Sequence, residues 1–347
     1  MGLRKSIVAV CVGAVALSPS VAAAEGKMSA WVFGDYYYFA DSHDSTSVDK
    51  SGFWFRLINL AWDEKFDESF SSRIRLEAAS PGSFTGVPQA LQVYTKDAWI
   101  KWTHARQSVI LGLATPPSHS FTEDIWGYRY IEKFPFEVAG FGGSRDIGLG
   151  VTGWLLQGDR LGYHLMVGNG AGLYSEQDSD KRASGSVRFK VTSALSLEAY
   201  GDYEKRPDHE DRVTFRGFAG YRAQRMRGAV EYDVQNRDQT TGGSYHLRVV
   251  SGFVAAGATE KVWLFGRVDR RMDADPGYTA ASAPGRPYLP YDASVSNTFI
   301  LAGLEFLPRE NVAFTPNVEM ILYDEPDGGG AAPTDDVVAR FTFMFKY

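Results

Sequence analysis

Hydrophobic and polar residues alternate with a period of two along most of the chain, in segments of about 10 residues. In one such segment Val187 and Phe189 share one face, whereas Arg188 and Lys190 share the other. Successive side chains of a β-strand point to opposite faces of a sheet, so this alternation predicts strands with one apolar and one polar face. About 16 such segments follow one another, and their lengths fit tilted strands that cross a membrane.

The connections between these segments are alternately long and short. The long connections fall on one side of the predicted sheet, and short turns join the strands on the other side. This is the arrangement of extracellular loops and periplasmic turns in a transmembrane barrel. We therefore predict an all-β fold, a transmembrane antiparallel β-barrel of about 16 strands. The longest connection, Thr115–Ser144, follows the fifth strand, and loops of this length usually carry function.

The first residues have the pattern of a secretory signal peptide, which we expect to span residues 1–24. The basic pair Arg4-Lys5 precedes the apolar stretch Ile7–Leu17, which is shorter than the roughly 20 residues of a membrane-spanning helix. The only cysteine, Cys11, lies in this stretch. The predicted barrel domain, residues 25–347, would therefore contain no disulfide and no thiolate metal site.

Composition narrows the class of protein further. The 36 glycines and the 14% of aromatic residues suit many short strands and turns. The mean hydropathy is −0.23, which argues against a helical membrane protein but not against a barrel whose lumen is polar. The net charge of −6 disfavours nucleic acid as a partner.

Charged residues on the predicted strands are expected to face the lumen, because a charge at the lipid midplane costs roughly 2–4 kcal/mol. The basic residues assigned to the lumen in this way are Arg73, Arg75, Arg188, Arg216, Arg248 and Arg267. Acidic residues such as Glu198 and Asp233 share the same faces on neighbouring strands. The basic residues therefore have two interpretations: a ladder for anionic solutes, or ion pairs that brace the wall by about 0.2–1 kcal/mol each.

The long connection carries charges of both signs, which we assign to a candidate pore constriction. Opposed charges at a constriction orient polar solutes, whereas a single sign selects ions. The candidate residues are Arg129, Lys133, Glu132, Glu123, Asp124 and Arg145. Arg129 is the first candidate for an anion contact, because a guanidinium matches phosphate or carboxylate in a bidentate way. The alternative is that Arg129 ties the loop to the barrel wall.

The last residues alternate between aromatic and other side chains from Phe341 to Tyr347, which resembles the closing strand of bacterial outer-membrane barrels. The stretches Ile125–Arg129, Ser144–Gly148 and Gly168–Gly170 resemble the phosphate-selective porin O/P family. This resemblance implies a homotrimeric barrel of about 16 strands whose long loop after strand 5 folds into the lumen. It also implies that the outer-membrane assembly machinery recognises the closing strand.

We predict a porin of the bacterial outer membrane that allows passive diffusion of small hydrophilic solutes, including inorganic anions such as phosphate. Its partners would be outer-membrane lipid, the solutes themselves and further copies of the chain. No enzyme activity, cofactor or metal is indicated. Two alternatives stay open: a plugged barrel with a structural or surface-interaction role, and a barrel hydrolase that uses His164 or His246, both expected in the lumen.

Overall fold

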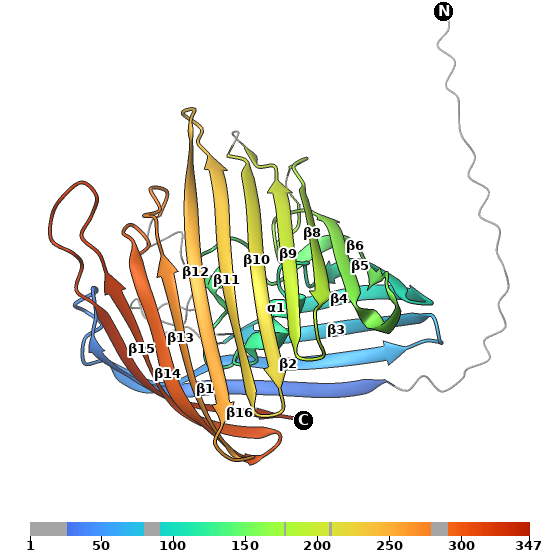
Figure 1. Ribbon diagram of the computed structural model, residues 1–347, viewed down its shortest axis with the longest axis horizontal. Helices are drawn as coiled ribbons and strands as arrows, with labels where there is room; N and C mark the ends of the chain where they lie inside the picture. Colours follow the sequence, from blue (N-terminus) through green and yellow to red (C-terminus); the bar gives the residue numbers. More distant parts are fainter. Residues whose placement is uncertain (1–25, 80–90, 177, 208–209, 279–290) are drawn as a thin grey trace, which may run out of the picture.

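The computed structural model describes residues 26–79, 91–176, 178–207, 210–278 and 291–347. The strands in these ranges form one closed antiparallel sheet (Figure 1). The predicted signal peptide, residues 1–24, lies outside the described residues. The strands of the barrel are β1 (Lys27–Asp41), β2 (Ser51–Lys65), β3 (Phe70–Ala79), β4 (Gln92–His104), β5 (Gln107–Ala114), β6 (Asp146–Trp154), β7 (Leu161–Gly168), β8 (Arg182–Lys190), β9 (Leu195–Glu204), β10 (Arg212–Ala223), β11 (Met226–Asp238), β12 (Ser244–Gly257), β13 (Val262–Arg271), β14 (Asn297–Arg309), β15 (Val312–Tyr323) and β16 (Asp336–Lys346).

In the part of the chain that the structure describes, the assigned helical segments are few and short. They are α1 (Ser120–Trp126), α2 (Pro135–Val138) and the 3-10 turn η1 (Gln157–Asp159). Among the described residues, no helix is long and apolar enough to cross a membrane.

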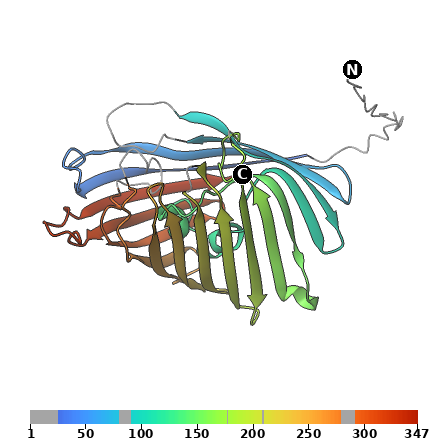
Figure 2. The same ribbon diagram turned by 90° about the horizontal axis from the view of Figure 1, so that it is seen from above.

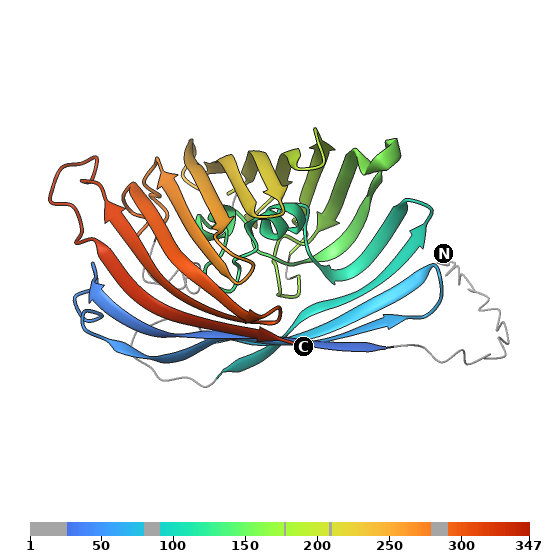
Figure 3. The ribbon, with the colours of Figure 1, turned by 60° about the horizontal axis from the view of Figure 1, so that its bottom comes forward.

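The last strand closes the barrel against the first, as the sequence predicts. Each strand pairs with its neighbours in the chain, and β16 also pairs with β1, where Phe343 lies opposite Gly34. The backbone N–H of Tyr347 donates to the carbonyl of Ala30 at 2.9 Å. Figure 3 shows these blue and red strands side by side. Closure leaves the sheet without a free edge.

The outer face of the barrel is an apolar belt. Ile74, Leu165 and Val230, from strands around the ring, are more than half exposed, at 56%, 53% and 62%. On the same strands Arg75 and Glu231 point inward and are wholly or partly buried. An exposed apolar surface of this extent requires lipid around it, so the strands span a membrane.

Two β-bulges change the simple alternation of side chains. The pairing of β1 with β2 skips Arg56, and the pairing of β3 with β4 skips Lys96. A bulge inserts one unpaired residue and lets two consecutive side chains face the same way. Arg56 with Leu57, and Lys96 with Asp97, are consequently buried on the lumen side.

The β5–β6 connection, residues 115–145 and here called the inserted loop, lies inside the ring of strands with α1 and α2 (Figures 2 and 3). Its aromatic residues, Trp126, Tyr128, Phe134 and Phe136 among them, form the main hydrophobic core with inward residues of the wall. The described wall residues of this core come from β1, β2, β9 and β12–β16, with none from β3–β8. The core therefore fills one side of the lumen.

Candidate functional site

Buried arginines of the wall hold the inserted loop by its backbone. Arg216 Nη1 donates to the carbonyl of Ser118 at 2.8 Å, Arg56 donates to the carbonyl of Ile131, and Arg267 donates to that of Lys133. Each of these guanidinium groups also pairs with a wall carboxylate, and the pairs are Arg56–Asp35, Arg216–Glu198 and Arg267–Asp269. Because the acid neutralises the charge, the remaining N–H groups are left to bind the loop.

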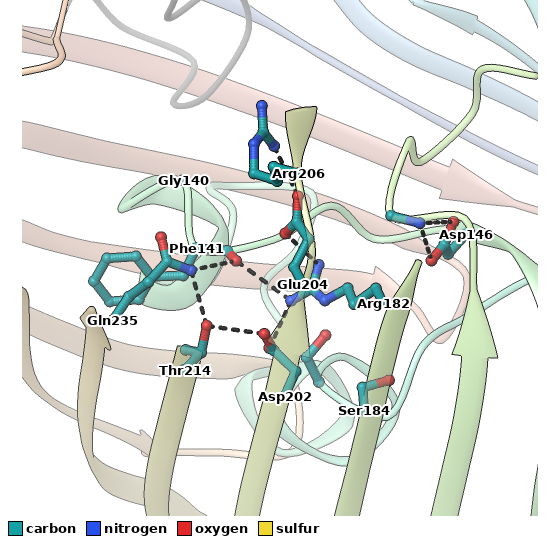
Figure 4. A network of polar contacts seen from close by, with 12 residues as sticks. Gly140, Phe141, Asp146, Arg182, Ser184, Asp202, Glu204, Arg206, Thr214 and Gln235 are labelled. Atoms are coloured by element: carbon teal, nitrogen blue, oxygen red, sulfur yellow. Dashed lines mark hydrogen bonds and ion pairs between the residues drawn. The ribbon is translucent and has the colours of Figure 1, made fainter. Parts of the chain in front are cut away.

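A second anchor holds the end of the inserted loop near the external mouth of the barrel (Figure 4). Gln235 Nε2 donates to the carbonyl of Phe141 at 3.0 Å and to Thr214 at 2.8 Å. Arg182 donates to the same carbonyl at 3.4 Å and to Asp202 at 2.7 Å. Backbone contacts of this kind do not depend on the side chains of the loop, so they fix its path while leaving its charges available.

The charged side of the inserted loop carries a mixed cluster. Arg129 Nε lies 3.4 Å from Glu123, and Lys133 Nζ lies 3.4 Å from Glu137. Arg129 also approaches Glu137, with 3.9 Å between the nearest nitrogen and oxygen atoms. The cluster therefore has two cations and two carboxylates within ion-pair range of one another, which is the arrangement of a constriction with opposed charges.

This cluster faces charged residues of β3 and β4. Lys96 Nζ lies 3.2 Å from Glu77, and its other charged neighbours include Glu137 and Arg129. Arg145, at the end of the inserted loop, pairs with Asp97 of β4. The loop and this part of the wall thus present interleaved positive and negative groups to each other.

The two loop carboxylates differ in their pKa. Burial raises the pKa of Glu123, and Arg129 offsets only part of this effect. Burial acts in the same direction on Glu137, but Lys133 and Arg129 outweigh it and lower the pKa of Glu137 to about 2. Glu137 therefore keeps its charge at any ordinary pH, whereas Glu123 takes up a proton at a higher pH than a usual glutamate does.

The structure brings together four of the six candidate constriction residues: Glu123, Arg129, Lys133 and Arg145. Glu132 lies apart, because its side chain is fully buried and accepts the backbone N–H of Lys133 at 2.7 Å. Asp124 is also apart: its side chain is 72% exposed and lies 3.9 Å from Arg222.

The candidate basic residues of the lumen are mostly paired with acids. Arg73 lies 2.6 Å from Asp63, Arg75 lies 2.9 Å from Asp97, and Arg216 lies 2.8 Å from Glu198. Pairs between neighbouring strands favour the bracing interpretation over a ladder of free cations. Arg188 differs, because its guanidinium stacks on the rings of Phe121 and Trp154 at 4.6 and 4.7 Å.

The expectation that Arg248 faces the lumen is wrong. In β12 the inward residues are Leu247 and Val249, which belong to the core formed with the inserted loop, and Arg248 lies on the outer face. It pairs with Asp273 at 2.6 Å near the external end of the strand. The cost of a charge on the lipid side falls toward the membrane surface, which makes this position tolerable.

His246 precedes Arg248 by two residues and lies on the same outer face, with a side chain that is 53% exposed. It was expected in the lumen, and this expectation is wrong as well. His164 does point inward and lies opposite Ser186 in the strand register. Among the described residues, His164 forms no hydrogen bond with Ser186, so the pair lacks the contact of a nucleophile with its base.

Sequence reasoning missed Lys96 and Arg56, because both are bulge residues. The prediction from sequence also used the charged residues of the inserted loop and did not consider its aromatic residues. The only signal in the sequence was the concentration of rings between Phe121 and Phe141.

The open space of the lumen lies away from the aromatic core. A cavity of about 620 Å³ follows β2–β4 at the end with the short turns, where Arg73, Trp99 and Lys101 contribute to its lining. A cavity of about 280 Å³ lies at the external end, between the inserted loop and β8–β10, and Lys133 and Glu137 line it. The mixed cluster includes Lys133 and Glu137, so it borders the external cavity directly.

The closed barrel with its apolar belt and inserted loop defines a transmembrane barrel of the outer-membrane type. Its fold is similar to that of an anion-selective porin from Comamonas acidovorans, with 12% identity, a TM-score of 0.64 and coverage of 93% of this chain and 100% of that one. It is similar to the outer membrane channel DcaP of Acinetobacter baumannii, with 13% identity, a TM-score of 0.64 and coverage of 96% and 100%. A trimer form of OmpT, an outer membrane protein of Vibrio cholerae, has 10% identity, a TM-score of 0.63 and coverage of 94% and 100%.

These proteins are similar to the chain in fold. They are outer-membrane barrels, which agrees with the predicted location in the bacterial outer membrane. No protein-family model matches the sequence. No curated protein matches it either.

Proposed function

We propose that the chain forms a water-filled channel in the outer membrane for passive diffusion of small hydrophilic solutes, including anions such as phosphate. The observation that carries the proposal is the mixed-charge cluster of the inserted loop, which faces β3 and β4 on the side of the lumen that the aromatic core leaves unfilled. Interleaved charges of this kind orient a polar solute as it passes. Glu123, Arg129, Lys133 and Arg145 are the proposed constriction residues.

A homotrimer is part of the same proposal. OmpT of Vibrio cholerae, with a similar fold, occurs in a trimer form, which supports this assembly. Outer-membrane lipid around the belt and the assembly machinery acting on the closing strand are further proposed partners.

The plugged barrel is a second candidate, and one observation favours it. Trp126, Tyr128 and Phe136 of the inserted loop are at most 2% exposed, so the loop fills part of the lumen with a dry aromatic core. Single-channel recording of the purified barrel in planar lipid bilayers separates the two candidates. The channel proposal expects discrete conductance steps in potassium chloride. A barrel that inserts into the bilayer but gives no steps would support the plug.

Replacing Arg129 and Lys133 together by alanine is expected to shift the reversal potential in a potassium chloride gradient toward that of a cation-preferring channel. The change removes two positive charges from the cluster and leaves Glu123 and Glu137 in place. The outcome that contradicts this role is a reversal potential equal to that of the unmodified protein. Arg248→Ala is the matched control, because Arg248 lies on the outer face of the barrel and pairs with Asp273, away from the lumen.

Lowering the pH is expected to move the selectivity in the opposite direction, toward anions. Protonation of Glu123 removes a negative charge from the cluster, and its raised pKa places this step at a higher pH than for an exposed glutamate. Glu137 stays ionised in the same range because its pKa is about 2. The reversal potential measured at a series of pH values checks this, and the pH-dependent shift should disappear in Glu123→Gln.

A further inference from the structure

At the external mouth of the barrel, inward side chains of four neighbouring strands form one row. The strand register places Arg182 of β8 opposite Glu204 of β9, Glu204 opposite Arg212 of β10, and Arg212 opposite Arg237 of β11. Three guanidinium groups and a single carboxylate therefore lie side by side across these strands on the inner wall. Arg206, which follows β9, adds another positive charge beside them.

All but one of these arginines have a carboxylate partner. Arg182 binds Asp202 at 2.7 Å, and Arg206 binds Glu204 at 2.7 Å (Figure 4). Arg237 binds Asp275 at 2.8 Å. Within the described part of the chain, the side chain of Arg212 forms no ion pair and no hydrogen bond.

The position of Arg212 is electrostatically unfavourable without a ligand. Its like-charged neighbours are Arg237 and Arg206, and the nearby carboxylate of Glu204 is already engaged by Arg206. Repulsion between like charges at short range is strong where water is partly excluded. An anion beside Arg212 would supply the missing negative charge.

The space for such an anion exists. Arg212, Arg206 and Lys133 line the external cavity of about 280 Å³, and its other walls include the glycine-rich backbone from Gly140 to Gly143. Apart from Phe141, the residues of this stretch are glycines, which have no side chains to occupy the cavity. The carboxylates of Glu137 and Glu204 also line the cavity, and they are engaged by Lys133 and Arg206. Lys133 also belongs to the mixed cluster of the inserted loop, so this cavity adjoins the proposed constriction.

We propose that this external cavity is a binding site for a small oxyanion with at least two acceptor oxygens, such as inorganic phosphate or a short dicarboxylate. Arg212 is the primary contact, because its planar guanidinium matches two oxygens at once and the other described residues give it neither an ion pair nor a hydrogen bond. Arg206 and Lys133 hold the opposite side of the anion. The site captures anions before they reach the constriction, and in this respect it rests on the proposed channel function. The cavity faces the lumen, which separates it from lipid headgroups.

The first test uses the thermal unfolding of the full-length barrel in detergent, with inorganic phosphate, succinate and chloride at equal ionic strength. Phosphate or succinate is expected to raise the unfolding temperature above its value in chloride, because a ligand that binds only the folded state stabilises it. In Arg212→Ala, the concentration of phosphate or succinate that gives half of the maximal rise in unfolding temperature is expected to be about tenfold higher. This is the change expected from the loss of a charged hydrogen bond to the anion. Arg212→Lys keeps the positive charge and should lose less affinity for the anion than Arg212→Ala does. Preference between phosphate and succinate identifies the oxyanion class.

Arg309→Ala is the matched control, since Arg309 is exposed at the other end of the barrel and should leave the effect unchanged. Retention of the heat-modifiable mobility of the barrel on gels confirms that each variant is folded. Equal responses of Arg212→Ala and the unmodified protein would overturn the site, as would equal unfolding temperatures in all three salts. This readout needs no conduction, so absence of conductance steps would contradict the channel function alone.

Discussion

Replacing Arg56 by alanine is expected to destabilise the folded barrel by roughly 3–5 kcal/mol, because it leaves the buried carboxylate of Asp35 without its counter-charge. Both side chains are 0% exposed, and Arg56 is the bulge residue that joins β2 to the backbone of the inserted loop at Ile131. The substitution therefore removes an ion pair and a loop anchor together. Urea unfolding in lipid vesicles, followed by tryptophan fluorescence, measures the change.

The control for this prediction is Arg73→Ala. Arg73 also forms a pair with a neighbouring strand, but its side chain and that of Asp63 are each 32% exposed. Partly exposed pairs contribute about 0–1 kcal/mol, so the loss should be small. If Arg56→Ala costs no more than Arg73→Ala, the buried pair does not hold the loop. The doubly substituted variant Arg56→Met with Asp35→Leu, which leaves no buried charge, is expected to recover part of the stability.

The barrel could be predicted from the sequence because its strands obey one strong physical rule. Lipid excludes charges, so alternation along each strand shows which face is outside, and the structure confirms this for Val187 and Phe189 against Arg188 and Lys190. The aromatic residues from Phe341 to Tyr347 similarly indicated the closing strand. Both signals are local and repeat from strand to strand.

The candidate site could be predicted only in part, because it depends on contacts between distant residues. The bulges that turn Arg56 and Lys96 inward break the local alternation and leave no mark in the residue pattern. Arg248 was assigned to the wrong face because apolar residues can point inward where a loop covers them, as Leu247 and Val249 do. Charge alone could not show which side of the lumen the loop would fill.

The division of the lumen follows from where aromatic and charged residues lie on the inserted loop. Tyr130 donates to Glu305 of β14 at 2.6 Å, and Phe136 packs edge-on against Tyr200 of β9. Arg129 and Lys133, in contrast, belong to the cluster that faces β3 and β4. A loop with one apolar and one charged side can attach to one wall and line a pore along the other.

Replacing Trp126 by alanine is expected to cost about 3–5 kcal/mol of stability and to raise the single-channel conductance. Trp126 is 2% exposed and packs against Phe253 with 4.9 Å between ring centroids, and the guanidinium of Arg267 lies 5.0 Å from its ring. Its Nε1 donates to the carbonyl of Glu132 at 2.8 Å, which would lose its donor. Because this ring attaches the inserted loop to β12 and β13, its removal should loosen the loop and widen the path beside it.

Trp102→Ala provides the comparison, since Trp102 lies on the lipid-facing side of β4 and is 43% exposed. It is expected to lose less stability than Trp126→Ala and to keep the conductance of the unmodified protein. Urea unfolding in vesicles and bilayer recording of both variants give the two readouts. A Trp126→Ala barrel that is clearly destabilised but conducts as before would mean that the loop stays in place without this ring, because the backbone anchors from Arg216 and Gln235 suffice. A barrel with unchanged stability and unchanged conductance would contradict the role of the aromatic core in positioning the loop.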